Sequence, residues 1–368
     1  MATSSQERPK TRPVKVGNVT VGGDALVVVE SMTKTATSEI DETVEQLHRM
    51  AEAGCELARV AIPDRDAVSC FGKVRSRSPI PLVADIHFDY RLALAVLEEG
   101  ADGIRINPGN LGGKVPLERV AKAVLERKVS LRVGVNAGSL ETTVYVKHGG
   151  ATPLALAKSA IVYVRWLEEF GVENMILSAK SNSVPVTIEA YRILSRVSDY
   201  PLHIGITEAG LATAGIVKSA VGLGILLHEG IGDCLRVSLT GPPEEEVRVG
   251  YEILKSLHLR EKGPIFVSCP TCARCRVDLH AIAEKVYRAI QDIDQPITVA
   301  VMGCEVNGPG EAREADVGLA CGQKSGLIFR KGEVVRKVKH DEMVEVLLAE
   351  VRSLVRNIGQ GRDVNGKS

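Results

Sequence analysis

Three cysteines lie within seven residues of this 368-residue sequence, in the segment SCPTCARCR at 268–276. Thiolates at Cys–X–X–Cys spacing bind structural zinc and iron–sulfur clusters. The segment supplies Cys269, Cys272 and Cys275, but no fourth cysteine follows at the bacterial-ferredoxin spacing. Cys304 follows an apolar run and begins a Gly- and Pro-containing loop, so it is the candidate fourth ligand. The spacing predicts a metal site and leaves zinc and the cluster types open.

Other ligand sets remain compatible with this spacing. A carboxylate from Glu305, Glu311 or Glu314 could replace one thiolate, and free thiols or a redox pair are the alternative without metal. The remaining cysteines are expected to be buried apolar residues: Cys55, Cys70, Cys234 and Cys321.

Charged residues interrupt apolar runs that otherwise resemble buried parallel strands. Five such runs contain a basic residue, and three contain an acid, Glu30, Asp85 or Glu208. Internal salt bridges would explain any single one of these residues. An excess of cations in one cavity instead favours an anionic ligand, and the arginine fork fits phosphate oxygens. The basic residues are Arg59, Arg105, Arg132, Lys180 and Arg236.

The elements that must position these residues alternate between strand and helix. Eight β-rich runs separated by helical patterns predict parallel strands with right-handed crossovers, which is the pattern of a TIM (β/α)8 barrel. An open doubly wound sheet is the alternative, but no GxGxxG follows the first strand. A hairpin at 15–23 is expected to close the N-terminal mouth of the barrel, and a loop insertion is expected at 139–152. The eight runs begin at Leu26, Leu57, Leu82, Gly103, Leu131, Met175, Leu202 and Leu235.

The helical pattern at 244–257 is followed by a break, HLREKGP, at 258–264. We therefore place a barrel domain at 1–258 and a small α/β (α+β) domain at 264–360. The second domain is expected to hold both cysteine loops, several strands and a closing helix from Asp341.

Composition excludes several classes of function. Basic and acidic residues number 46 each, and aromatic residues are 4%. A nucleic-acid surface would need a basic excess or stacking platforms. No apolar run is long enough for a membrane helix, and the polar N-terminus is unlike a signal peptide, so a cytoplasmic location is expected.

Eight motifs then occur in an order that resembles the bacterial 4-hydroxy-3-methylbut-2-en-1-yl diphosphate synthase family. The resemblance covers about residues 14–355. The motifs are ESMT (30–33), ADIHFD (84–89), IRINPGN (104–110), RVGVNAGSLE (132–141), GITEAG (205–210), GIGDCLRVSLT (230–240), SCPTC (268–272) and CEVNGPGE (304–311).

The resemblance implies a TIM barrel followed by a [4Fe–4S] domain, and a homodimer. It also implies reductive ring opening of 2-C-methyl-D-erythritol 2,4-cyclodiphosphate, with two electrons from flavodoxin or ferredoxin. The implied cluster ligands are Cys269, Cys272, Cys304 and Glu311, which makes Cys275 a non-ligand. A carboxylate binds iron less firmly than a thiolate, so Glu311 could yield an iron site to a substrate oxygen.

The same resemblance implies roles for residues of the barrel. The five basic residues would hold the diphosphate, and Glu208 would protonate the departing hydroxyl. Lys34 departs from the family, where Asn is expected. The additional residues expected to bind or orient substrate are Asp85, His87, Asn107, Asn136, Ser178, His203 and Ser238.

Two other functions remain possible from the residues alone. A phosphate-binding lyase or transferase barrel with a structural metal domain would contain zinc and no cluster. A non-catalytic iron–sulfur carrier would need no arginine-lined barrel, so the five basic residues argue against it.

Overall fold

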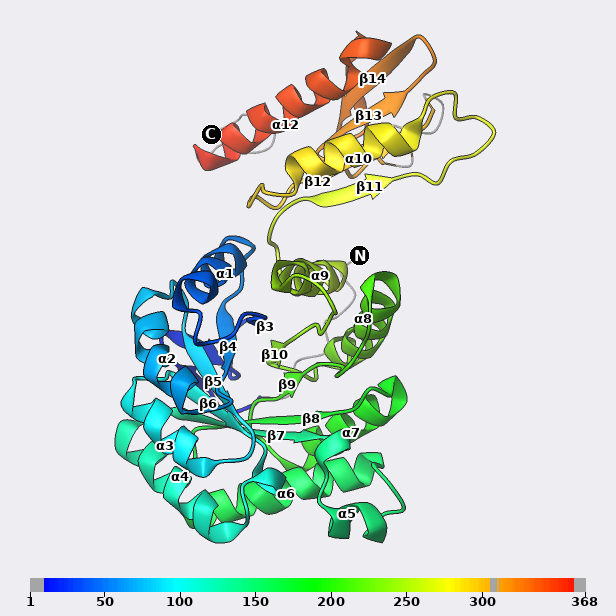
Figure 1. Ribbon diagram of the computed structural model, residues 1–368. Coiled ribbons are helices and arrows are strands. Elements are labelled where there is room, and N and C mark those ends of the chain that lie inside the picture. The colour runs from blue at the N-terminus through cyan, green and yellow to red at the C-terminus, as the bar shows by residue number, and fades with distance from the viewer. Residues whose placement is uncertain (1–9, 305–309, 311, 361–368) are drawn as a thin grey trace. The chain divides into compact units, whose positions relative to one another are not determined.

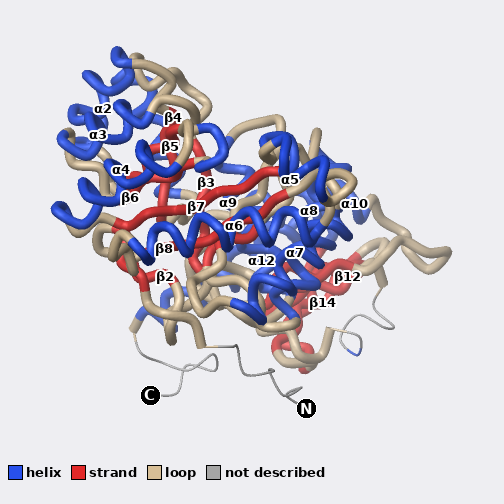
Figure 2. The backbone as a smooth tube through the Cα atoms, turned by 90° about the horizontal axis from the view of Figure 1, so that it is seen from below, coloured by secondary structure: helices blue, strands red, loops and turns tan. Residues whose placement is uncertain are grey.

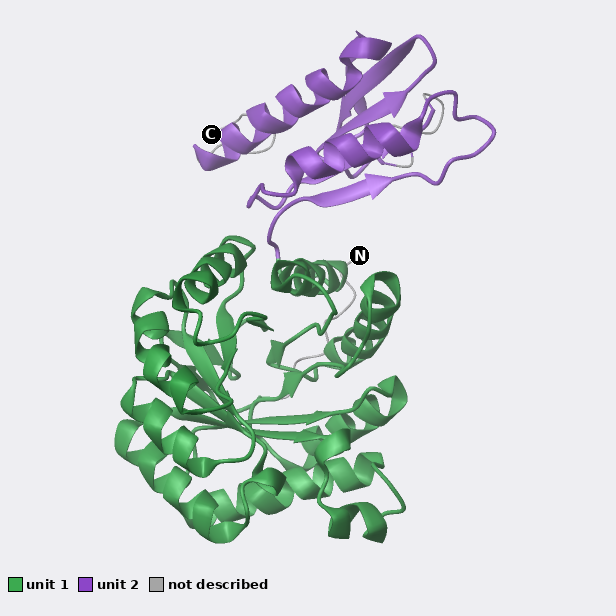
Figure 3. Ribbon diagram, in the orientation of Figure 1, with its two compact units in different colours: residues 1–260 green, residues 261–368 purple. Residues whose placement is uncertain are grey.

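The computed structural model describes residues 10–304, 310 and 312–360 (Figure 1). It divides into two compact units, Met1–Arg260 and Glu261–Ser368 (Figure 3). Among the described residues, no helix is both long and apolar enough to cross a membrane.

The first unit contains the predicted parallel barrel. Its eight strands follow the order β8-β7-β6-β5-β4-β3-β10-β9, and a parallel bridge between Leu177 and Leu202 joins the two ends. The ring is therefore nearly closed, which confirms the barrel and excludes the open doubly wound sheet. The strands are β3 (Val28–Met32), β4 (Leu57–Ala61), β5 (Leu82–Ile86), β6 (Gly103–Ile106), β7 (Ser130–Asn136), β8 (Met175–Lys180), β9 (His203–Ile204) and β10 (Cys234–Leu235).

Helices surround these strands (Figure 2), and each buries an apolar face against them. Some of them begin with a side-chain cap: Asp64 accepts a hydrogen bond from Ala67 N, and Thr152 accepts one from Ala155 N before Pro153. The helices are α1 (Ile40–Glu52), α2 (Arg65–Arg77), α3 (Tyr90–Glu98), α4 (Lys114–Arg127), α6 (Pro153–Glu169), α7 (Val184–Val197), α8 (Ala212–His228) and α9 (Pro243–Ser256).

A hairpin closes the N-terminal end of the barrel, as predicted. Strands β1 (Val14–Val16) and β2 (Val19–Val21) pair antiparallel. Their buried valines form one apolar cluster with side chains from inside the barrel, among them Val28, Leu57 and Cys234. This floor leaves the C-terminal ends of the strands for ligands, as in other barrels of this kind.

The expected loop insertion at 139–152 contains a short helix, α5 (Thr142–Lys147), after the 3-10 turn Ala137–Ser139. Glu141 fastens this segment to α6 by accepting hydrogen bonds from Ser159 and Tyr163. The insertion is therefore tied to α6 and contains a helix where the sequence predicted only a loop. A second 3-10 turn, Pro108–Asn110, follows β6.

Among its described residues, the second unit contains a five-stranded sheet and the helices α10 and α12. The order is β11-β12-β13-β14-β15, parallel as far as β13 and antiparallel beyond it. Alternate strand residues, such as Val299 and Val301, form one apolar core with α10 and α12. The elements are β11 (Ile265–Ser268), α10 (Leu279–Ile290), β12 (Thr298–Met302), β13 (Val317–Cys321), β14 (Ser325–Arg330), β15 (Glu333–Lys339) and α12 (Met343–Gly359).

Gly318 lies beneath the buried Phe329 ring in this sheet, and a Cβ atom at residue 318 would overlap that ring. We therefore expect Gly318→Ala to lower the free energy of unfolding of the second unit by about 1–3 kcal/mol. Gly359→Ala is the control, because nothing lies within 4 Å of a Cβ there. Denaturant unfolding monitored by circular dichroism would measure both. Equal stability of the two variants would contradict the packing described here.

Candidate active site in the barrel

The most buried charges of the barrel form a bidentate ion pair. Arg132 on β7 donates from both Nη atoms to the two carboxylate oxygens of Glu30 on β3, each at 2.6 Å. Both side chains are buried. Burial alone would raise the pKa of Glu30, but the Arg132 guanidinium holds that pKa below its ordinary value. Glu30 is therefore a carboxylate at neutral pH, and it anchors Arg132 across the barrel.

Asp85, at the end of β5, is a second anchor. Its Oδ1 accepts a hydrogen bond from Arg105 Nη1 at 3.1 Å, and its Oδ2 lies 3.6 Å from Arg59 Nε and 3.5 Å from His87 Nε2. Burial opposes ionisation of Asp85, but Arg59, His87 and Arg105 together lower its pKa far below the usual range. One carboxylate thus orients three predicted substrate-binding residues.

A glycine makes room for Arg105. The Nη2 of Arg105 donates to the carbonyl oxygen of Gly134 at 3.2 Å, and a Cβ at residue 134 would overlap the Arg105 guanidinium. Asn136 lies two residues further along β7. With its amide nitrogen directed at Val135 O, its amide oxygen accepts a hydrogen bond from Arg105 Nη2 at 3.2 Å. The contact brings Asn136 into the same site as Arg105.

Lys180, at the end of β8, has no counterion among the described residues. Its side chain is buried, and its pKa is well below the usual value because of burial and the nearby Arg59 and Arg236. Gly205 lies opposite, where a Cβ would come within 2.7 Å of Lys180 Nζ. The four barrel arginines, Arg59, Arg105, Arg132 and Arg236, outnumber the three carboxylates that pair with them, so an anion entering this end of the barrel would be stabilised.

His203 lies beneath these cations as a neutral imidazole. Its pKa is well below its usual value because of burial and the nearby Arg132 and Lys180. Nδ1 lies 3.1 Å from Cys234 Sγ, and Nε2 lies 3.7 Å from Glu30 Oε1. These three groups are close enough to suggest a metal site. However, both oxygens of Glu30 already accept from Arg132, and burial raises the pKa of Cys234, so a cation has no suitable ligands there.

The other predicted polar residues occupy the surrounding loops and strands. Asn107 donates from Nδ2 to Ser139 Oγ at 2.5 Å, and Ser178 is buried on β8. Glu208 is exposed on the loop after β9, with a left-handed backbone at φ 53°. Ser238 is half-buried on the loop after β10. The structure therefore pairs the four arginines with buried carboxylates inside the barrel, whereas Glu208 and Ser238 lie on the loops after β9 and β10.

Sequence reasoning missed a third buried carboxylate, Glu246 on α9. It accepts from Lys34 Nζ at 2.7 Å and from Leu239 N at 3.0 Å, and it faces Arg236 Nε at 3.4 Å. The helical pattern of α9 placed Glu246 among three consecutive acids, which are usually solvent-facing.

The cysteine loops lie in the second unit. The N–H of Gly303 donates to Cys269 Sγ at 3.1 Å, and a Cβ at residue 303 would lie 3.0 Å from Cys275 Sγ. Cys272 is exposed and Cys304 half-buried. Cys321, expected to be a buried apolar residue, is buried close to this group; burial, with Cys275 and Cys269 nearby, raises its pKa to about 12. The predicted ligand Glu311, and Glu305, lie outside the described residues.

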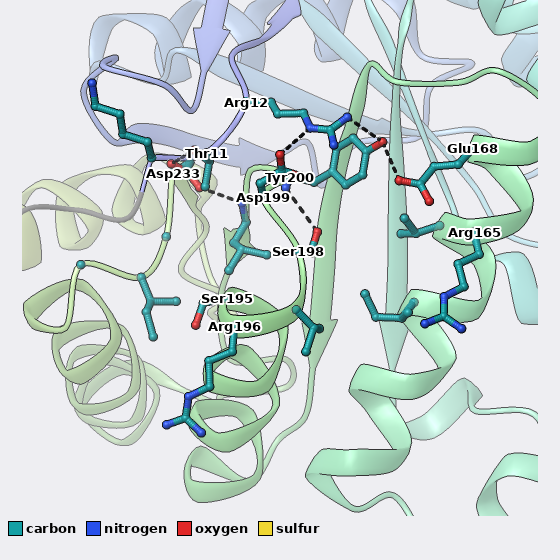
Figure 4. Close-up of a pocket in the computed structure, with 18 residues that line it drawn as sticks. Thr11, Arg12, Arg165, Glu168, Ser195, Arg196, Ser198, Asp199, Tyr200 and Asp233 are labelled. Atoms are coloured by element: carbon teal, nitrogen blue, oxygen red, sulfur yellow. Dashed lines mark hydrogen bonds and ion pairs between the residues drawn. The ribbon is translucent and has the colours of Figure 1, made fainter.

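A cavity of about 570 Å³ lies at the opposite, N-terminal end of the barrel (Figure 4). There Arg12 stacks on Tyr200 at 4.5 Å and pairs with Asp199 at 2.8 Å, while Thr11 donates to Asp233 at 2.9 Å. None of the predicted substrate-binding residues lines this cavity. Its polar contacts fasten the N-terminal segment to the barrel, so we assign it a structural role.

Comparison with known proteins covers both units. The GcpE TIM-barrel domain matches residues 11–251, and the GcpE protein C-terminal domain matches residues 265–353. A relative from Geobacter sulfurreducens, called 4-hydroxy-3-methylbut-2-en-1-yl diphosphate synthase (flavodoxin), is 55% identical over 95% of this chain and 99% of its own length. A relative from Caldanaerobacter subterraneus with the same name is 50% identical over 95% and 98%. With both domains matched and such identity over nearly its whole length, the chain belongs to the GcpE family.

Proposed function

We propose that this protein catalyses the reductive conversion of 2-C-methyl-D-erythritol 2,4-cyclodiphosphate to 4-hydroxy-3-methylbut-2-enyl diphosphate. Two electrons and two protons are consumed, a ring C–O bond breaks, and one hydroxyl leaves as water. The observation that carries the proposal is the set of four barrel arginines that outnumber their three carboxylate partners, together with the activity named for the relatives.

The basic residues supply the binding energy for the diphosphate. Arg59, Arg105 and Arg132 are held by carboxylates, so their positions are set before the ligand arrives. Preorganised donors in a water-poor site stabilise charge without first reorienting. Arg236 adds a fourth guanidinium, paired with Glu246, and Lys180, whose pKa is lowered by burial and by Arg59 and Arg236, would hold its proton more readily beside a bound anion. The exposed Glu208, on the loop after β9, is the proposed proton donor to the departing hydroxyl.

The cysteine loops suit a [4Fe–4S] cluster with Cys269, Cys272, Cys304 and Glu311 as ligands. Gly303 gives the fit: its N–H reaches one ligand sulfur, and a side chain at residue 303 would crowd the neighbouring sulfurs. Hydrogen bonds to sulfur tune such clusters. When bound, the cluster supplies electrons one at a time to the substrate. Cys275 donates to Val277 O at 3.3 Å, in keeping with a thiol that is not a ligand.

Flavodoxin is the proposed electron donor, as in the names of the relatives, with ferredoxin as the other carrier of this class. We also propose a homodimer. Helix α8 exposes a nearly uncharged face containing Leu211, Val217, Val221 and Ile225, on which Lys218 is the one charged residue before His228. Two copies could bury this face against each other without desolvating many charges, which is typical of homodimer interfaces.

Substitution of Cys304 tests the cluster. Anaerobically purified wild-type protein should contain about four irons per chain, absorb in the visible range and turn over the cyclodiphosphate with a strong reductant. Cys304→Ser should lose most of the iron and the activity, whereas Cys70→Ser, on α2, should retain both. One zinc and no iron in the anaerobic wild-type protein would instead support a phosphate-binding barrel with a structural metal.

Titration of Lys180 provides a pH test. Because its pKa lies below the usual value, the lysine loses its charge at a lower pH than an exposed lysine, and affinity for an anion should fall with it. Lys180→Arg stays charged. Calorimetric titration with inorganic pyrophosphate over a pH series that extends well below the ordinary lysine pKa should show the wild type losing affinity relative to this variant as the pH rises. Parallel pH profiles would show that Lys180 does not contribute a titrating charge to the site.

The dimer is tested by placing a charge on α8. Wild-type protein should have twice the chain mass in sedimentation velocity, and Val221→Arg should shift it toward monomer because a buried charge opposes association. Val115→Arg, at a still more exposed apolar position on α4, is the control. A monomeric wild type, or a dimer unaffected by Val221→Arg, would contradict this assignment.

A further inference from the structure

We propose that Glu246 is a positioning residue that sets the geometry of Arg236 for anion binding, with Lys34 as a second member of the same site. The inference rests on the proposed function, because it concerns the cavity in which the diphosphate would bind. Glu246 lies on α9, outside the ring of strands, yet its side chain is completely buried.

The seam between the last and the first strands explains why a carboxylate is needed there. Strands β10 and β3 pair only through Cys234 with Val28 and Leu235 with Val29. Beyond those residues β10 and β3 do not pair through their backbones, and hydrogen bonds to the side chain of Glu246 connect the two segments instead. Its Oε2 accepts from Ser31 Oγ at 2.7 Å, and its Oε1 accepts from Leu239 N at 3.0 Å. One side chain therefore fastens the segment after β10 to β3.

Arg236 lies in that segment and points into the barrel. Cys234, two residues earlier, packs inside the barrel floor, and residues two apart on a strand share a face. The Nε of Arg236 is buried and has no hydrogen bond among the described residues; Glu246 Oε2, at 3.4 Å, forms an ion pair with it. The carboxylate thus restrains the Nε side of the guanidinium and leaves its two Nη groups for a ligand.

Lys34 completes the arrangement at the rim. Its Nζ donates to Glu246 Oε1 at 2.7 Å and to Leu239 O at 3.0 Å, while its backbone N–H donates to Gln46. The side chain is about one-third exposed (36%), so a third ammonium N–H is open to solvent or ligand. With Lys34 and Arg236 on one carboxylate, this site keeps a net positive charge.

Whether Glu246→Gln strengthens or weakens anion binding distinguishes a positioning role of Glu246 from a purely electrostatic one. Glu246→Gln removes a negative charge near the cavity, so Coulomb's law alone predicts tighter binding of an anion. A positioning role predicts weaker anion binding, because the glutamine NH2 would face the Arg236 Nε–H and displace the guanidinium. We expect Glu246→Gln to weaken pyrophosphate binding about 10-fold, or 1.4 kcal/mol, and to raise KM much more than it lowers kcat.

The experiment is a double-mutant cycle on the full-length protein, titrated calorimetrically with inorganic pyrophosphate. In an Arg236→Gln background, Glu246→Gln should have almost no further effect, since the two residues act through one contact. Glu245→Gln is the matched control: Glu245 is in the same helical turn, exposed and paired with Arg248. If Glu246→Gln does not fold, Glu246→Asp is the second variant, because it keeps the charge but shortens the side chain. It should weaken pyrophosphate binding when Arg236 is present and have almost no effect in the Arg236→Gln background.

The outcomes separate the two proposals. Equal or tighter binding by Glu246→Gln, or the same loss with and without Arg236, would overturn the role of Glu246 and leave the anion-binding barrel intact. A wild-type protein that binds neither pyrophosphate nor the cyclodiphosphate would overturn the proposed function and this inference together.

Discussion

The barrel must hold several positive charges in a space from which water is largely excluded. An unpaired charge in such a place costs several kcal/mol, and removing one partner of a buried pair typically costs about 3–5 kcal/mol. The structure meets this constraint with three buried carboxylates, Glu30, Asp85 and Glu246, each from a different element. These carboxylates fix the cations but do not neutralise all of them, and the remaining charge is what makes the cavity suitable for an anionic ligand.

The backbone is adapted to the same constraint. Gly134, on β7, and Gly205, just after β9, have no side chains and so leave the space that Arg105 and Lys180 occupy. The hairpin β1–β2 closes the other end of the barrel with valines, which keeps solvent away from the buried Glu30 and His203. Charge, glycine placement and the apolar floor therefore depend on one another.

The sequence predicted the barrel because parallel strands buried on both faces give long apolar runs, and the five basic residues stood out against them. It also predicted the hairpin floor and the second unit's elements, where periodicity is strong. Glu246 was not predictable, because its role arises from contacts with Ser31 and Leu239, distant in sequence. The same holds for Cys234: expected to be only a buried apolar residue, it contacts His203 through the fold. The short helix α5 was missed because glycines and polar residues surround it.

The central claim is that the barrel recognises its ligand through the charge of a diphosphate. Titration calorimetry of the full-length protein with 2-C-methyl-D-erythritol 2,4-cyclodiphosphate and with uncharged 2-C-methyl-D-erythritol tests it most directly. The account predicts one diphosphate ligand bound per chain, with affinity that falls steeply as salt increases, and no measurable binding of the uncharged polyol. Equal affinity for the two compounds, or salt-independent binding of the diphosphate, would contradict it.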